Sequence, residues 1–292
     1  MNLWQQYLSP HSIPDAIQAL TSAPGPALPI AGGTDLLLDI QQGRHAPVHT
    51  LVDLTSIPEL NLLEEREGQL FIGAAASLTR IVRHPLVAHH AQALAEACDL
   101  VGGPQVRNVA TLGGNVAHAL PAADGTIALL ALDVEAEIAD LSGLRRVPFG
   151  DLFLGPGKST LKHGEELLVG FYLPLMKSHQ ASCFKRIMRP QGVALPIINL
   201  AIRVSRKNDA VEDVRIAVGP GAAIPWRAQK AEQALLGKPV NNDTMDAALE
   251  ALLAQVGFRS SPRRASAEYR KHIVAGLFKD TLETAWLRAN RS

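Results

Sequence analysis

A run of apolar residues interrupted by two glycines is the first strong pattern in the chain. Residues 28–40 read LPIAGGTDLLLDI, which predicts a short buried strand, a glycine turn and a helix. Thr34 is placed to cap this helix, and we expect the helix to end at Gly43. The pattern returns in residues 109–124, VATLGGNVAHALPAAD. The purpose of two such turns is the first question that the sequence raises.

Shorter periodic segments predict the other elements of the first half. Ser12 caps a predicted amphipathic helix, IPDAIQAL. Alternating residues around a turn predict two hairpins, in residues 60–74 and 134–149, and the second turns at Ser142-Gly143. Strands are predicted in residues 27–30, 49–54 and 165–175, and helices in residues 78–85, 86–98 and 124–133.

Residues 100–117, LVGGPQVRNVATLGGNVA, resemble neither a regular element nor a solvated loop. Four glycines and a proline make the segment too glycine-rich for a helix or strand, and it is too apolar for a loop in water. A buried loop needs partners for its backbone N–H groups. A bound ligand is one way to supply them.

The sequence becomes polar in residues 175–182, LMKSHQAS, and we expect a domain boundary there. This gives a first domain of residues 1–176, with subdomains of about 1–54 and 55–176, and a second domain of residues 177–292. The second domain is predicted to hold three antiparallel strands (182–188, 196–207 and 210–219) followed by three helices (225–237, 241–257 and 265–290). Strands and helices do not alternate regularly, so the expected class is α+β.

Composition narrows the possible functions. The 292 residues are 47% hydrophobic, and 28 basic residues balance 28 acidic ones, which argues against a nucleic-acid-binding protein. The N-terminus has no signal-peptide pattern, and no apolar run is long enough to span a bilayer, so we expect a cytoplasmic protein without a membrane span. Cys98 and Cys183 fit no disulfide framework and are too few to ligate an iron–sulfur cluster.

Glycine turns at the ends of strands suit the binding of an anion. Their backbone N–H groups can point at one place without side chains in the way. Thr34 and Asn115 would add polar side chains, and two converging turns would suit a ligand with two phosphates. His118 follows the second turn and either reaches a ligand or is structural. Taken singly, each turn is also consistent with an ordinary strand-to-helix connection.

Other binding and catalytic motifs are absent from the sequence. There is no GxGxxG after the first strand and no GxxxxGK[ST], so neither a Rossmann fingerprint nor a P-loop is supported. HExxH, CxxC and G-x-S-x-G are also missing, and the ten histidines are scattered.

The segments AGGTDL (31–36), GPQVRNVATLGGNV (103–116) and PAADGTIALLALD (121–133) resemble the FAD-binding medium subunits of molybdenum hydroxylases. This family includes subunits of carbon monoxide dehydrogenase, nicotinate dehydrogenase and 4-hydroxybenzoyl-CoA reductase, and the resemblance is strongest to the bacterial xanthine dehydrogenase FAD-binding subunits. It implies an FAD-binding domain of the vanillyl-alcohol-oxidase (PCMH) type in two subdomains, followed by a domain like the C-terminal domain of the CO dehydrogenase flavoprotein.

The resemblance also implies which residues contact a non-covalently bound FAD. The two glycine turns would hold the pyrophosphate, Asp124 would bind the ribityl or adenosine side, and Leu167 and Lys185 would lie beside the flavin. The full set is Leu28, Pro29, Ile30, Ala31, Gly32, Gly33, Thr34, Asp35, Ala75, Ala110, Thr111, Leu112, Gly113, Gly114, Asn115, Asp124, Leu167 and Lys185. No catalytic acid or base is assigned, because electron transfer through a flavin does not need one.

Three of these positions have a structural alternative. Asp124 could cap the helix that follows it, Leu167 could belong to the core, and Lys185 could be a solvated residue on an edge strand. The basic run of residues 259–272, RSSPRRASAEYRKH, is either a solvated helix start or a contact with a partner subunit or with the flavin domain.

In this family the chain works with other subunits. The resemblance implies a small [2Fe–2S] subunit, a large molybdopterin-binding subunit and an external electron acceptor, possibly NAD⁺. The cysteine-rich insert of the 4-hydroxybenzoyl-CoA reductase branch is missing here. Pro190 and Pro196 make residues 188–199 stiffer and more apolar than the family pattern, which puts NAD⁺ in doubt. A stand-alone flavin oxidoreductase and an accessory or assembly protein are the alternatives.

Overall fold

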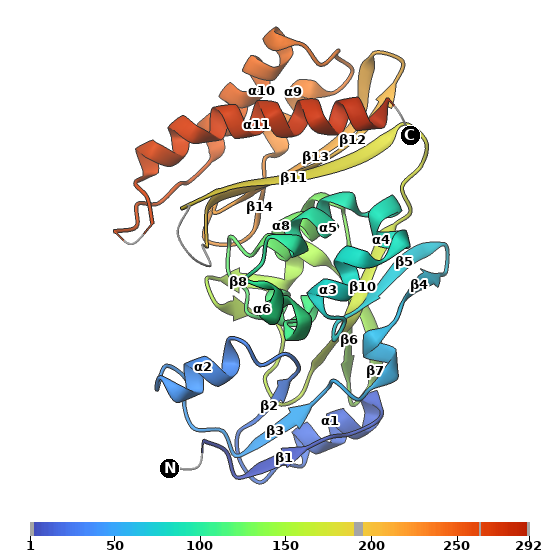
Figure 1. The fold of residues 1–292 in the computed structure, drawn as a ribbon, viewed down its shortest axis with the longest axis vertical. Helices are drawn as coiled ribbons and strands as arrows, with labels where there is room; N and C mark the ends of the chain where they lie inside the picture. Colours follow the sequence, from blue (N-terminus) through green and yellow to red (C-terminus); the bar gives the residue numbers. More distant parts are fainter. Residues whose placement is uncertain (1–2, 190–194, 263, 291–292) are drawn as a thin grey trace.

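The computed structural model describes residues 3–189, 195–262 and 264–290. Three layers of structure follow one another along the long axis, in the order of the sequence (Figure 1). A small N-terminal sheet is at one end, a larger sheet with helices is in the middle, and a C-terminal sheet with helices is at the other end. No helix in the described residues is long and apolar enough to cross a membrane.

The N-terminal sheet is parallel, with strand order β1-β3-β2 (β1 Gln6–Leu8, β2 Ala27–Ile30, β3 Thr50–Asp53). Helix α1 (Ile13–Thr21) packs on it, and Ser12 caps the helix as predicted, accepting the Asp15 N–H at 3.2 Å. Helix α2 spans Leu36–Gln41, so its N-cap is Asp35, and no side chain caps it. The prediction that Thr34 caps this helix is therefore wrong, because the helix starts one residue later than the pattern suggested.

The middle sheet is antiparallel, in the order β4-β5-β10-β6-β7 (β4 Leu63–Arg66, β5 Gln69–Gly73, β6 Glu135–Asp140, β7 Gly143–Pro148, β10 Leu167–Pro174). Both predicted hairpins are present. Asp140 pairs with Gly143, so the second hairpin turns one residue earlier than expected. Short elements complete this region: η1 Pro58–Asn61, η2 Phe149–Leu152, β8 Phe153–Gly155 and β9 Lys158–Ser159.

Six helices follow β5 in the sequence: α3 Leu78–Arg83, α4 Pro85–His90, α5 Gln92–Asp99, α6 Pro104–Val109, α7 Leu112–Ala117 and α8 Asp124–Ala131. Of these, α5 and α8 pack against the C-terminal sheet. The expectation that residues 100–117 lack regular structure is wrong, since α6 and α7 lie there. Pro104 occupies the first turn of α6, and the side chain of Thr111 caps α7. These end signals outweigh the glycine content of the segment.

The C-terminal sheet is antiparallel, in the order β11-β12-β13-β14 (β11 Gln180–Met188, β12 Pro196–Lys207, β13 Ala210–Gly219, β14 Trp226–Arg227). On one face it packs against α9 (Gln229–Leu235), α10 (Asn242–Gln255) and α11 (Ala267–Ala289). On the other face, Phe184, Ala201 and Ala217 join the core formed with α5 and α8. The three predicted strands and three predicted helices of this half are present, and the fold is of the expected mixed α and β class. The prediction is wrong for residues 226–227, which it placed in the first helix: they form β14, and α9 begins only at Gln229.

Strand β10 is the central strand of the middle sheet. A substitution at Gly170 in this strand tests how tightly the core is packed. A Cβ atom on Gly170 would lie 2.5 Å from the Phe71 ring and 2.8 Å from the Ile72 carbonyl oxygen. We expect Gly170→Ala to lower the free energy of unfolding by about 1–3 kcal/mol through overpacking, measured by urea unfolding. Gly150→Ala is the control, because a Cβ there meets nothing within 4 Å. Equal stabilities of the two variants would contradict the packing described here.

Candidate functional site

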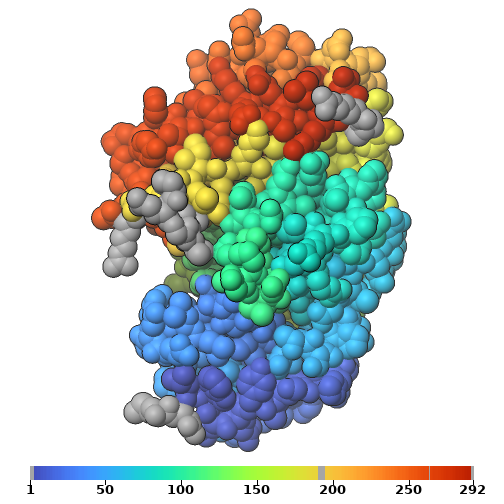
Figure 2. Space-filling view, in the orientation of Figure 1, coloured from blue at the N-terminus to red at the C-terminus, as the bar shows by residue number. Residues whose placement is uncertain are grey.

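The two double-glycine segments touch each other. A Cβ atom on Gly32 would lie 2.2 Å from the Val109 carbonyl oxygen and 2.8 Å from the Cα of Ala110. Real Cβ atoms do not approach other atoms within 3.0 Å, so residue 32 must be glycine for the segments to meet. On this side of the molecule the surface is hollowed between the N-terminal residues, in blue, and the green helices (Figure 2).

The first turn leaves a row of backbone N–H groups without acceptors. It follows β2, which contains Leu28, Pro29 and Ile30, and Ala31 leads into it. Gly33 has φ +64°, a left-handed conformation that glycine adopts freely. No described residue accepts a hydrogen bond from the N–H of Gly32, Gly33, Thr34 or Asp35. Successive free N–H groups of this kind form a concave site for an anion.

The second segment is held mainly by its own backbone. The Leu112 N–H donates to the Ala76 carbonyl at 3.2 Å, and the Gly113 N–H donates to the Ala74 carbonyl at 2.8 Å. A Cβ on Gly113 would lie 2.6 Å from that same Ala74 oxygen, so this glycine also permits a close backbone approach. Ala75 lies between these two acceptors and is buried.

Two groups near the second pair of glycines are among those that have no partner in the described residues. One is the N–H of Thr111, whose side chain caps α7 by accepting the Gly114 N–H at 3.1 Å. The other is Oδ1 of Asn115, which is buried. An unpaired buried oxygen is costly, so it signals a donor that comes from outside the described residues.

Asp124 is closed off from solvent by the C-terminal sheet. Only 5% of it is exposed, and Asn199 donates a 2.6 Å hydrogen bond to its Oδ1. Arg186 forms an ion pair with its Oδ2. Burial raises the pKa of Asp124, and Arg186 and Asn199 act in the opposite direction. Asp124 is the first residue of α8 but caps no N–H there, so the capping alternative is wrong.

Asp124 is nevertheless connected to the second glycine segment. The next residue, Gly125, lies against Asn115, because a Cβ on it would be 2.8 Å from Asn115 Oδ1. Arg186 also donates a hydrogen bond to the Leu100 carbonyl at 2.5 Å, at the start of the segment that contains α6. Arg186 therefore links the C-terminal sheet to Leu100, at the start of residues 100–117, and to Asp124, whose neighbour Gly125 lies against Asn115.

The structure does not bring Leu167 or Lys185 into this cluster. Leu167 is 1% exposed in the core between β10 and α1. The Lys185 ammonium donates to Asp280 Oδ1 at 2.6 Å and to Thr284 Oγ1 at 2.9 Å, both on α11. Lys185 therefore lies on the face of β11 that is turned away from α5 and α8.

Sequence reasoning missed Arg186 and Asn199. Neighbouring residues of a strand point to opposite faces, so Lys185 and Arg186 cannot both face the flavin domain. The signal was present in CFKRIM, because apolar Phe184 and Arg186 are two residues apart and share a face.

His118 connects the two glycine segments at the surface, since its Nδ1 lies 3.7 Å from Asp35 Oδ2.

The ion pair between Asp124 and Arg186 has a measurable consequence. We expect Arg186→Gln to lower the free energy of unfolding by about 3–5 kcal/mol at neutral pH, because a buried carboxylate loses its counter-charge. The deficit should shrink as the pH falls, since burial raises the pKa of Asp124 and the folded variant takes up a proton more readily than the unfolded chain. Urea unfolding over a range of pH measures both effects.

The exposed Arg83, which forms no ion pair with a described residue, provides the control Arg83→Gln. Its effect should stay within about 0.5 kcal/mol. The double variant Asp124→Asn with Arg186→Gln should recover much of the loss, because it buries no charge. A cost of Arg186→Gln no larger than that of Arg83→Gln would contradict the assignment.

Known proteins are similar to this chain along nearly its whole length. Residues 3–176 match the family described as "FAD binding domain in molybdopterin dehydrogenase", and residues 182–285 match the "CO dehydrogenase flavoprotein C-terminal domain". The chain is 35% identical over 277 residues to the putative xanthine dehydrogenase FAD-binding subunit XdhB of Escherichia coli (strain K12), covering 94% of this chain and 93% of the relative. It is 28% identical to the carbon monoxide dehydrogenase medium chain of Hydrogenophaga pseudoflava, covering 97% of both.

The fold is similar to that of solved structures of the same group. A chain of carbon monoxide dehydrogenase from Hydrogenophaga pseudoflava superposes with a TM-score of 0.91 at 28% identity, covering 97% of this chain and 98% of the other. A chain of quinoline 2-oxidoreductase from Pseudomonas putida 86 gives 0.89 at 27% identity, covering 98% of each. The chain therefore belongs to the family of FAD-binding subunits of molybdenum hydroxylases, which are the flavin-containing components of oxidoreductase complexes.

Proposed function

We propose that this chain passes electrons from iron–sulfur centres on a partner subunit, through the FAD that it binds, to an external acceptor. The close contact of Gly32 with Val109 and Ala110 is the observation that carries the cofactor site. This contact places the N–H groups of the first turn close to the second segment, which contains the Thr111 N–H and Asn115 Oδ1. None of these groups has a partner among the described residues. A dinucleotide with two linked phosphates matches that arrangement.

The residues present fit a non-covalently bound FAD. The N–H groups of Gly32, Gly33 and Thr34 would bind the pyrophosphate, as would the N–H of Thr111. A ribityl hydroxyl would donate to the buried Oδ1 of Asn115, which has no donor among the described residues. When bound, FAD supplies both one-electron and two-electron redox chemistry, and the protein supplies its placement.

Asp124 and Lys185 enter this proposal differently. Both oxygens of Asp124 are engaged by Arg186 and Asn199, so we propose that Asp124 supports the site by fixing Gly125 and Asn115. Lys185 is held by Asp280, and its contact with the flavin stays a prediction, as does that of Leu167.

The need for partner subunits follows from the chemistry that the chain lacks. A cluster needs four ligands, usually thiolates. Cys98 and Cys183 are both buried, and burial raises the pKa of Cys183 to about 12 and that of Cys98 further still. Among the described residues, no group of three or more His, Cys, Asp or Glu side chains is arranged to hold a metal ion.

We therefore propose a small [2Fe–2S] subunit and a large molybdopterin-binding subunit as partners. Relatives named as medium chains or medium subunits support this, among them that of nicotine 6-hydroxylase from Paenarthrobacter nicotinovorans, at 32% identity. The matching region is 22% of the much longer aldehyde oxidase 1 of Bos taurus. In that relative, a region similar to this chain is therefore joined to a much longer sequence in one polypeptide.

The electron acceptor is the least constrained part of the proposal. NAD⁺ is the candidate, and it accepts a hydride from reduced flavins. Pro190 lies outside the described residues, and Pro196 begins β12. NAD⁺ and a cytoplasmic location therefore stay predictions.

The alternatives are a stand-alone flavin oxidoreductase and an FAD-binding accessory or assembly protein. A stand-alone enzyme needs substrate-binding side chains over the flavin, and none of the three tyrosines (Tyr7, Tyr172 and Tyr269) lies in the glycine segments. Absorption spectra of the purified chain, alone and co-expressed with its partner subunits, distinguish these functions. Reduction of the bound flavin only in the assembled complex and with the complex's substrate is the result expected here.

The contact at Gly32 gives a direct test of the site. We expect Gly32→Ala to weaken FAD binding by roughly tenfold or more, because its methyl group pushes the second segment away from the first. Quenching of flavin fluorescence on binding measures the dissociation constant, and far-ultraviolet circular dichroism checks the fold. Gly150→Ala, where the added Cβ meets nothing within 4 Å, should bind FAD like the wild type. Unchanged binding by Gly32→Ala would reject the two-segment site.

A further inference from the structure

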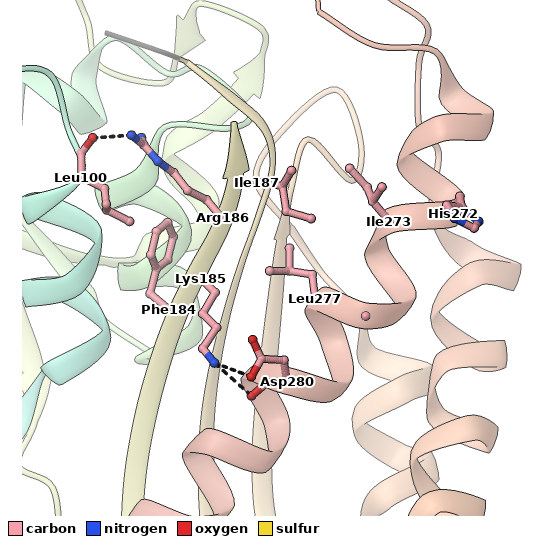
Figure 3. Close-up of a pocket in the computed structure, with 10 residues that line it drawn as sticks. Leu100, Phe184, Lys185, Arg186, Ile187, His272, Ile273, Leu277 and Asp280 are labelled. Atoms are coloured by element: carbon pink, nitrogen blue, oxygen red, sulfur yellow. Dashed lines mark hydrogen bonds and ion pairs between the residues drawn. The ribbon is translucent and has the colours of Figure 1, made fainter. Parts of the chain in front are cut away.

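A groove of about 800 Å³ follows one edge of strand β11, between Leu100 and helix α11 (Figure 3). β11 is the first strand of its sheet, so one of its edges has no neighbouring strand. Phe184 and Arg186 line the groove from one face of the strand, and Lys185 and Ile187 line it from the other. Because residues of both faces contribute, the groove runs along the free edge itself.

Half of this edge is already covered and half is not. Glu96 of α5 accepts the Phe184 N–H at 2.8 Å, and Arg288 of α11 donates to the Ser182 carbonyl at 2.9 Å. In an antiparallel strand every second N–H points to the same edge, so the Arg186 N–H also faces outward. No described residue accepts it. Proteins rarely leave such an edge open, because it is a template for another strand.

The walls of the groove are largely apolar. Leu100 stands on one side, and Ile273 and Leu277 of α11 stand on the other. Gly276 lies between these two α11 residues, and a Cβ on it would meet nothing within 4 Å. A glycine inside a long helix costs stability relative to alanine, and here it leaves this position of the α11 wall without a side chain.

A basic cluster lies at the end of the groove. Its members are Arg189, Arg259, Arg264, Arg270 and Lys271, and the groove lining reaches their neighbours Ile187 and His272. Arg189 donates to the Arg264 carbonyl at 3.0 Å, and Arg270 donates to the carbonyls of Ile197 and Arg259. None of the five forms an ion pair with a carboxylate of a described residue.

Arg270 makes the cluster unusual. It is only 3% exposed, it lies in the first turn of α11, and a cation at a helix N-terminus is unfavourable. Burial, Arg264 and Arg259 together lower its pKa. Buried arginines are normally paired with an anion, and in residues 259–272 the only acidic residue is the exposed Glu268.

We propose that this groove binds an extended segment of the iron–sulfur subunit, which adds a strand to the edge of β11 and places an acidic side chain on the basic cluster. The inference rests on the proposed function, which supplies that partner. Main-chain hydrogen bonds to the second half of β11 give affinity, and the apolar walls and the arginines give specificity.

The position of the groove favours the electron-delivering subunit over the molybdenum subunit. Arg186 lines the groove, and its guanidinium binds Asp124, which adjoins Gly125 and, through it, Asn115 of the second glycine segment. An occupant of the groove would therefore contact Arg186, and Asp124 and Gly125 connect Arg186 to Asn115 of the proposed flavin site. Electron delivery requires that kind of proximity.

Gly276 allows the groove to be filled without disturbing the core. Gly276→Phe should weaken binding of the FAD-loaded chain to the isolated iron–sulfur subunit by roughly tenfold or more, the size of a hot-spot effect. Gly276→Ala should bind like the wild type, since a methyl group leaves the groove open. Glu283→Phe, at an exposed position on the same helix, is the matched control and should also bind normally. Sedimentation measures the affinities, and flavin absorbance confirms equal FAD content.

Charge reversal tests the basic cluster separately. Arg264→Glu should weaken the same complex and reduce its dependence on salt. Lys207→Glu, exposed at the far end of β12, should change neither.

The outcomes separate this inference from the proposed function. Equal affinity of the wild type and Gly276→Phe for the iron–sulfur subunit overturns the groove assignment. If Gly276→Phe weakens binding of the molybdenum subunit but not of the iron–sulfur subunit, the choice of partner is overturned. If the wild type retains FAD but binds no iron–sulfur subunit, the proposed function fails, and the inference fails with it.

Discussion

The absence of a side chain at residue 32 is the constraint on which the proposed flavin site depends. Only glycine allows the end of β2 to approach the carbonyl oxygen of Val109, because any Cβ would be 2.2 Å from it. That approach brings together groups that have no partner among the described residues: the N–H groups of the first turn, the Thr111 N–H and the buried Asn115 oxygen. The anion binding proposed for this site thus rests on backbone geometry more than on side-chain charge.

The second glycine segment is kept in place by two kinds of contact. Backbone hydrogen bonds to Ala74 and Ala76 fix it to the end of β5. The buried pair of Asp124 and Arg186 fixes its surroundings to the C-terminal sheet. Burying two charges is expensive, so such a pair does more to specify one arrangement than to stabilise it. Here the arrangement it specifies is the position of the C-terminal sheet relative to the flavin domain.

The C-terminal half also carries two features that its own packing does not satisfy. The second half of β11 has a free edge, and the basic cluster beside it has no carboxylate partner among the described residues. A chain that worked alone would gain by covering the edge and neutralising the cluster. A subunit of a larger complex gains by presenting both to another chain, and membership of the family gives that view independent support.

The sequence by itself determined the features that depend on neighbouring residues. The Ser12 cap, the two hairpins, the three long C-terminal strands and the three helices after them all follow from local periodicity and from residues at element ends. The double-glycine turns, and the resemblance that they carry, pointed to FAD. Local signals also misled, since the glycines of residues 100–117 hid α6 and α7.

Only the tertiary structure decided which residues meet. The contact of Gly32 with Val109, and the ion pair of Arg186 with Asp124, join residues that are far apart in the sequence. The face on which Lys185 lies depends on the register of β11 with β12, which the packing of α5, α8 and α11 fixes. If the register of a strand shifts by one residue, every side chain of that strand moves to the opposite face of the sheet. No local pattern contains that information, because it belongs to the contacts between distant segments.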